Sequence, residues 1–133
     1  MQITDIITSQ NLFLDLVESE ADRNTLNHNP RVFCFDQVEL TIEAPCGLTL
    51  DIEGGRPGKN LISEDQCTVW AGIFRNERGK LATKLEEHIF VPHDAGHGTV
   101  SWQEADGPSF TPQQLCDFAF RRLRETRRAM LRY

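Results

Sequence analysis

The C-terminal segment 111–132 constrains the fold more strongly than any other part of the sequence. Thr111 stands at an N-cap position, Pro112 at the first helical position, and Gln114 where the partner in a capping box belongs. At about 100° per residue, the apolar residues that follow fall on one broad face. These residues are Leu115, Cys116, Ala119, Phe120, Leu123, Met130 and Leu131. The pattern predicts a long amphipathic helix that buries this face.

The N-terminal segment 1–28 predicts a second helix. Leu12, Phe13, Leu16 and Val17 recur at helical spacing, and Ser9 is the expected N-cap. Ile3, Ile6 and Ile7 fit an earlier turn of the same helix. We expect the helix to end within "NHNP" at 27–30, because the residue before a proline disfavours the helical conformation.

Between these helices, residues 31–104 show the period of two that is typical of strands. Val38, Leu40 and Ile42 alternate with polar residues, and so do Leu48, Leu50 and Ile52. A later run alternates Leu81, Leu85, Ile89 and Val91, which we expect to face the core. Short turns that contain glycine and asparagine separate the runs, so the sequence predicts an antiparallel meander of about five strands.

One segment of the meander, 64–74, leaves two interpretations open. Ser63 and Gln66 fit a capping box, which would begin a helix. Thr68, Val69 and Gly72 favour a strand, because β-branched residues and glycine are poor helix formers. We favour the strand. The chain is then a single α+β domain, 1–133, in which the sheet packs against the long C-terminal helix and the N-terminal helix lies on the same side or at an edge.

Composition indicates a protein of the cytoplasm. No apolar run approaches the roughly 20 residues that span a bilayer, and the start lacks a basic region followed by an apolar block. Neither a membrane nor a cofactor is therefore expected. Four cysteines, at positions 34, 46, 67 and 116, are scattered without a close pair, which indicates reduced and mostly buried thiols rather than a zinc site or a disulfide framework.

The charge is divided unequally along the chain. From Thr111 onward six arginines face two acids, whereas the first 110 residues hold eight basic and eighteen acidic residues. Arg121, Arg124, Arg128 and Arg132 lie within an arc of about 80° on the polar side of the C-terminal helix. The arc is either a solvated face with local ion pairs, such as Asp117 with Arg121 and Glu125 with Arg121 or Arg128, or a surface for an acidic protein. The acidic body of the chain disfavours nucleic acid.

The segment "HIFVPHDAGHG" at 88–98 is the other candidate site. His93, His97 and either Asp94 or His88 could supply the three protein ligands of an open zinc site. Pro92, Gly96 and Gly98 disfavour a helix, so the spacing of four residues between His93 and His97 does not indicate two ligands on one helix face. We interpret the segment as a polar hairpin turn, with His88 on a solvent-facing side of the preceding strand.

Two function classes remain. The first is a small protein-binding module (an adaptor, inhibitor, immunity or chaperone-like protein) that engages a partner protein or a second copy through Arg121, Arg124, Arg128 and Arg132. The alternative is a small metal-binding protein or metal-dependent enzyme that uses His93, Asp94 and His97. The absence of a hydrolase or phosphate-loop motif favours a protein that is not an enzyme.

Overall fold

The protein is an α+β chain in which a seven-stranded antiparallel sheet lies between an N-terminal and a C-terminal helix in sequence. The computed structural model describes residues 1–34, 36–56, 67–77 and 80–131. Helix α1 is Ile3–Arg23 and helix α2 is Pro112–Leu131. The strands and one short 3-10 helix between them are β1 (Val32–Cys34), β2 (Gln37–Ala44), η1 (Pro45–Gly47), β3 (Leu48–Gly55), β4 (Val69–Glu77), β5 (Lys80–Gly96), β6 (Thr99–Glu104) and β7 (Ser109–Phe110).

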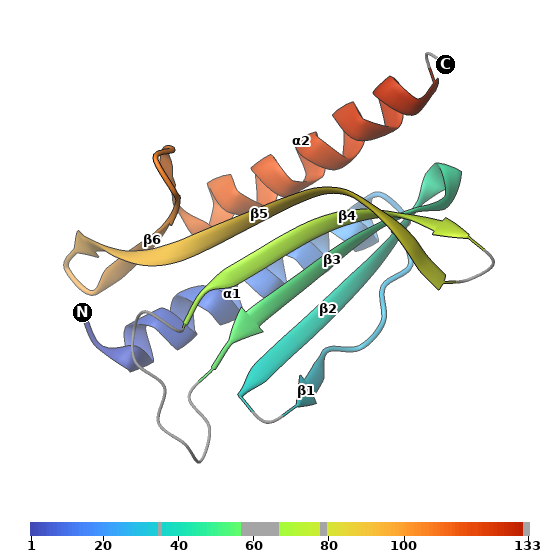
Figure 1. Ribbon diagram of the computed structural model, residues 1–133. Coiled ribbons are helices and arrows are strands. Elements are labelled where there is room, and N and C mark those ends of the chain that lie inside the picture. Colours follow the sequence, from blue (N-terminus) through green and yellow to red (C-terminus); the bar gives the residue numbers. More distant parts are fainter. Residues whose placement is uncertain (35, 57–66, 78–79, 132–133) are drawn as a thin grey trace.

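The sheet is a meander, as the sequence predicts, because its spatial order is the chain order β1 to β7 and every pair is antiparallel. It has seven strands rather than about five, since a turn divides 31–44 into β1 and β2 and the two-residue β7 precedes α2. The interpretation of 69–74 as a strand is confirmed by β4, while residues 64–66 and the capping glutamine at 66 lie outside the described residues. Both helices lie on one face of the sheet (Figure 1).

Helix α2 begins as predicted. The Gln114 backbone N–H donates to Thr111 Oγ1 at 3.2 Å, and the Thr111 N–H donates to Gln114 Oε1 at 3.0 Å. This reciprocal pair satisfies two backbone donors that a helix start otherwise leaves without partners. Leu115, Cys116, Ala119, Phe120 and Leu123 are buried, so the first three turns or so of the predicted apolar face contact the core.

The expected N-cap of α1 is wrong. Gln2 is the N-cap, and it forms a capping box with Asp5, so the helix already includes the early isoleucines. Ser9 is buried inside the helix, where its hydroxyl donates to the Val100 carbonyl at 3.2 Å and accepts from Trp102 Nε1 at 3.0 Å. A serine inside a helix normally faces water, but here it satisfies the indole N–H of a fully buried tryptophan.

The expected orientation of β5 is also wrong. Ile89 and Val91 are 53% and 43% exposed, whereas Phe90 is fully buried and His88 lies on the side of α2. Strand register sets this choice, because Ile89 pairs with Trp70 on the face that the helices leave uncovered. An irregularity between Ile73 and Phe74 shifts the β4–β5 register. Counting every second residue along the whole run therefore does not identify the residues of one face on both sides of that point.

One hydrophobic core joins α1, α2 and strands β2 to β6. In the part of the chain that the structure describes, neither helix is apolar enough over a sufficient length to cross a membrane.

Candidate protein-binding face on the C-terminal helix

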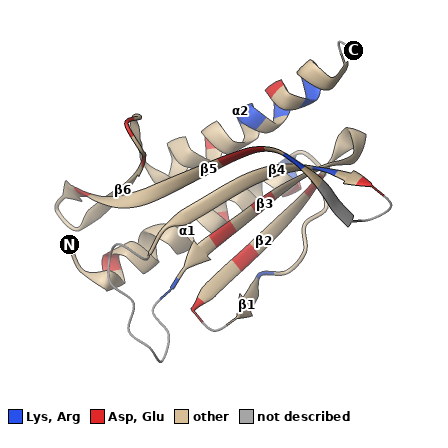
Figure 2. Cartoon of the chain, viewed as in Figure 1, with Lys and Arg blue, Asp and Glu red and all other residues tan. Residues whose placement is uncertain are grey.

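The C-terminal half of α2 concentrates basic charge, because it contains Arg122, Arg124, Arg127 and Arg128 within ten residues. Arg121, Arg124 and Arg128 are exposed, as predicted, and Arg132 lies outside the described residues. Figure 2 shows the basic residues of α2 gathered toward its C-terminal end, while acidic residues mark β2, β3 and β5. The last turns of α2 extend beyond the sheet, and Leu131 at the end is 65% exposed (Figure 1).

The local ion pairs expected for this helix form at a different arginine, Arg122. Its guanidinium makes a bidentate contact with Glu86 of β5, in which Nε donates to Oε2 at 2.8 Å and Nη2 donates to Oε1 at 2.6 Å. A third nitrogen, Nη1, pairs with Glu125 one turn along the helix. Asp117 instead accepts a hydrogen bond from Gln113. Asp117 and Glu125 therefore contact residues other than Arg121 and Arg128.

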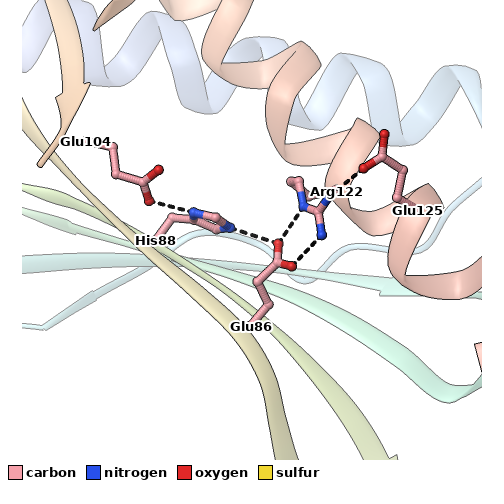
Figure 3. A network of polar contacts seen from close by, with 5 residues as sticks. All are labelled: Glu86, His88, Glu104, Arg122 and Glu125. Carbon is pink, nitrogen blue, oxygen red and sulfur yellow. Dashed lines mark hydrogen bonds and ion pairs between the residues drawn. The ribbon is translucent and has the colours of Figure 1, made fainter. Parts of the chain in front are cut away.

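The Arg122 contact is part of a wider network between the sheet and α2 (Figure 3). His88 lies between two carboxylates, with Nε2 at 2.8 Å from Glu86 Oε2 and Nδ1 at 2.5 Å from Glu104 Oε2. An ionised carboxylate only accepts, so each contact is a hydrogen bond to it when the ring nitrogen concerned carries a proton. The Arg122 guanidinium holds the pKa of Glu86 below its usual range against the opposing effect of burial, and His88 adds to the effect. The network fixes α2 against β5 and β6.

Three arginines of this half-helix have no such partner. Among the residues that the structure describes, no carboxylate oxygen lies within 4.0 Å of Arg124, Arg127 or Arg128. Arg121 places its guanidinium over the Phe118 ring, 5.5 Å from the centroid. The end of α2 is therefore not a solvated face stabilised by local ion pairs. Instead, three exposed arginines and the exposed Leu131 lie on the same end of the helix.

An apolar groove adjoins these cations where α2 passes the end of α1 and the β2–β3 connection. Its volume is about 190 Å³. Most of its lining residues are apolar, and Arg124 and Arg127 line it beside them. The lining residues are Asn24, Leu26, Ala44, Pro45, Leu48, Phe120, Leu123, Arg124 and Arg127. We call this feature the Arg124–Arg127 groove.

Sequence reasoning missed Arg127, although a signal for it exists. At about 100° per residue, Arg127 falls between Phe120 and Leu123, in the middle of the apolar arc. A charged side chain at that angle indicates that the helix has left the core by this turn. Arg127 is indeed exposed, and Met130, next on the same side, is only partly buried.

The histidine segment forms a strand end and a two-residue turn rather than one long turn. His93 and Asp94 belong to β5 and pair with Ser101 and Val100 of β6. His97 and Gly98 connect the strands with φ of 54° and 74°, the positive values that a tight hairpin turn of type I′ requires. His93, Asp94 and His97 are exposed, and Asp94 Oδ1 accepts from the Gly96 N–H at 2.9 Å.

His88 does not join these residues. It is only 19% exposed and faces α2, with its ring edge-on to Phe118 at 5.1 Å, so the expectation of a solvent-facing side chain is wrong. Its nitrogens are both occupied by carboxylates. The structure therefore separates His88 from His93, Asp94 and His97.

A different set of residues has ligand atoms gathered closely enough for a metal ion. Within the described ranges, carboxylate oxygens of Glu39, Asp51 and Glu53 lie within 4.8 Å of one another, and no other group of three acids, histidines or cysteines does so. All three project from β2 and β3 on the uncovered face of the sheet, since their neighbours in each strand are core residues. Oxygen ligands of this kind suit magnesium, calcium or manganese.

Protonation is a second way to relieve the repulsion among these carboxylates. Asp51 is 4% exposed, and burial together with the nearby Glu39 and Glu53 raises its pKa to about 7. Burial and Glu39 also raise the pKa of Glu53. The hydroxyl of Thr41 lies 3.3 Å from Asp51 Oδ1. Near neutral pH the cluster therefore holds fewer charges than its three carboxyls suggest.

The cysteines differ from expectation in burial, because Cys34 and Cys46 are exposed and only Cys67 and Cys116 are buried. Comparison of the chain with known protein families, with curated proteins and with solved structures finds no match. The function must therefore be argued from the surfaces of the molecule itself.

Proposed function

We propose that the protein is a protein-binding module that engages an acidic partner through the exposed arginines of α2 and the Arg124–Arg127 groove. The observation that carries the proposal is the coincidence on one helix end of an apolar groove and three cations that, among the described residues, have no carboxylate oxygen within 4.0 Å. A solvated helix face has no reason to combine the two. Interfaces typically do, with an apolar centre and arginines that contact the partner's acids.

The chemistry of the groove defines the partner. Leu26, Ala44 and Pro45, the apolar lining residues that are not fully buried, favour an apolar side chain of the partner, and the guanidinium groups favour carboxylates beside it. An acidic amphipathic segment of a protein satisfies both requirements. Nucleic acid satisfies only the second, and the net charge of −6 opposes its approach.

The cytoplasm is the compartment that fits this role. Cys34 and Cys46 are exposed thiols, which a reducing compartment keeps from forming disulfides. An adaptor, inhibitor, immunity or chaperone-like protein would all use such a surface without catalysis.

Quantitative capture from a lysate of the cells that encode the protein tests the proposal. We expect proteins enriched on the immobilised wild type to fall at least tenfold on Arg124→Glu/Arg127→Glu. Arg124→Lys/Arg127→Lys keeps both charges and serves as the matched control, which should retain most of the captured set. Capture of the same proteins in the same amounts by the glutamate variant would refute the role of the groove.

A further inference from the structure

The face of the sheet opposite the helices carries an apolar strip that the described elements leave partly exposed. Ile89 and Val91 of β5 are 53% and 43% exposed there. Trp70 pairs with Ile89 in the neighbouring strand, and the Phe74 ring lies 5.9 Å from the Trp70 ring. We call the strip formed by Trp70, Phe74, Ile89 and Val91 the outer strip. Among the described elements, α1 and α2 both lie on the opposite face (Figure 1).

Acidic groups border the outer strip. Glu87 of β5 is exposed and accepts a hydrogen bond from Trp70 Nε1 at 3.0 Å. Glu53 of β3 pairs directly with Trp70 on the other side, next to Glu39 and Asp51. Lys84 Nζ lies 3.1 Å from Glu87 Oε2 and compensates that charge, so the acidic side of the strip is the one formed by Glu39, Asp51 and Glu53. A matching surface needs apolar side chains flanked by cations.

The C-terminal half of α2 has that composition. It presents Leu131 at 65% exposure together with Arg124, Arg127 and Arg128, which have no carboxylate oxygen within 4.0 Å in the described part of the chain. Its last turns extend beyond the sheet, so they can reach another molecule (Figure 1). Opposite charges then face each other, whereas two outer strips or two helix ends would place like charges together.

We propose that the outer strip docks the C-terminal half of α2 from a second copy of this chain. This inference rests on the proposed function of α2 and names one partner for it. The two surfaces lie on opposite faces of the same molecule, so the contact is head-to-tail rather than self-complementary. Such contacts produce rings when the rotation closes and open chains when it does not.

Salt acts on this association in two opposing ways. Each copy has a net charge of −6, so copies repel one another at long range. At about 0.1 M salt the Debye length is about 10 Å, which screens that repulsion and leaves the close arginine–carboxylate contacts largely intact. At about 1 M salt the Debye length falls to about 3 Å, and we expect the contacts to weaken as well.

Head-to-tail assembly allows a decisive complementation experiment by sedimentation velocity. Arg124→Glu/Arg127→Glu destroys the helix surface and keeps the outer strip. Ile89→Lys/Val91→Lys destroys the outer strip at two exposed positions and keeps the helix surface. We expect the wild type to form dimers and larger species with rising concentration at about 0.1 M salt, and each variant alone to stay monomeric.

The mixture of the two variants decides the matter. Each retains the surface that the other lacks, so an equimolar mixture should form a one-to-one heterodimer that grows no further. Thr8→Lys/Ser19→Lys adds the same two positive charges on the exposed side of α1 and should assemble like the wild type. Circular dichroism of each variant shows that its fold is intact before mixing.

Any of three results overturns the inference. The wild type stays monomeric up to about 1 mM protein at about 0.1 M salt. Alternatively, assembly survives in either variant, or the mixture of the two variants stays monomeric. If the wild type is monomeric while the Arg124→Glu/Arg127→Glu variant still loses its captured proteins, only the second-copy inference fails. If the captured set does not change, the proposed function fails as well.

Discussion

Replacing Asp51 by asparagine should make the stability of the protein less dependent on pH. Asp51 is 4% exposed on β3, and its pKa is raised from 3.8 to about 7, first by burial and then by Glu39 and Glu53. The folded state therefore holds a proton that the unfolded state has already released above about pH 4. Asparagine has nearly the same shape and no such proton, so the variant isolates this contribution.

The sign follows from proton linkage. Because the folded pKa lies above the unfolded value, the stabilising contribution of Asp51 is complete below 3.8 and is lost as the pH rises toward about 7. Each pKa unit corresponds to about 1.4 kcal/mol. About two pH units of that window lie between pH 5 and pH 8. Over this range the free energy of unfolding of the wild type should therefore fall by about 3 kcal/mol relative to that of Asp51→Asn.

Urea denaturation of both proteins at pH 5, 6, 7 and 8, followed by circular dichroism, measures this difference. Asp106→Asn makes the same chemical change at an exposed turn residue and is the matched control. We expect its difference from the wild type to stay constant within about 0.5 kcal/mol, as surface changes usually do. A constant difference for Asp51→Asn across the series would show that the Asp51 carboxyl is neither desolvated nor repelled by its neighbours.

Three further substitutions test other parts of the structure. Leu123→Ala should cost about 2–4 kcal/mol of the free energy of unfolding through a cavity beneath α2, and a denaturant melt with a loss below about 1 kcal/mol would contradict that docking. Ser9→Ala should cost about 1–3 kcal/mol, because the buried Trp102 indole N–H loses its acceptor, and an unchanged melt would contradict the contact. His93→Ala with His97→Asn should change stability by no more than about 0.5 kcal/mol, since asparagine suits the turn, whereas bound zinc that survives dialysis and disappears in this variant would contradict a purely structural turn.

Local signals were sufficient for the elements of the fold. The capping box at Thr111 and Gln114 and the period of two in β2 and β3 are properties of neighbouring residues, and the structure has them where the sequence places them. Two of the errors concern information that is not local. The face of Ile89 depends on its register with Trp70 across a strand irregularity, and the role of Ser9 depends on Trp102, far along the chain.

The same distinction applies to the candidate site. The exposure of Arg121, Arg124 and Arg128 follows from the helical period. Their lack of carboxylate partners among the described residues does not, because it depends on Arg122 reaching Glu86 of β5 and taking Glu125 as well. The groove could not be predicted either, because its wall includes Asn24 and Leu26, which follow α1, and Pro45 of η1.

The acidic cluster illustrates a signal that could have been used. Glu39 and Thr41 alternate with core residues in β2, and Asp51 and Glu53 do so in β3. Two adjacent strands of a hairpin with acids on the same side predict close carboxylates once the register is known. The pairs Glu39 with Glu53 and Thr41 with Asp51 supply that register.

Chemical-shift mapping by nuclear magnetic resonance tests the central claim, the protein-binding role of the Arg124–Arg127 groove, most directly. The probe is the partner that the wild type captures and the glutamate variant does not, titrated into isotope-labelled protein of 133 residues. We predict that the largest shifts occur at the Nε–Hε groups of Arg124 and Arg127 and at the methyl groups of Leu26 and Leu123. Shifts centred on the β5–β6 hairpin around His93, with the groove unchanged, would contradict the account.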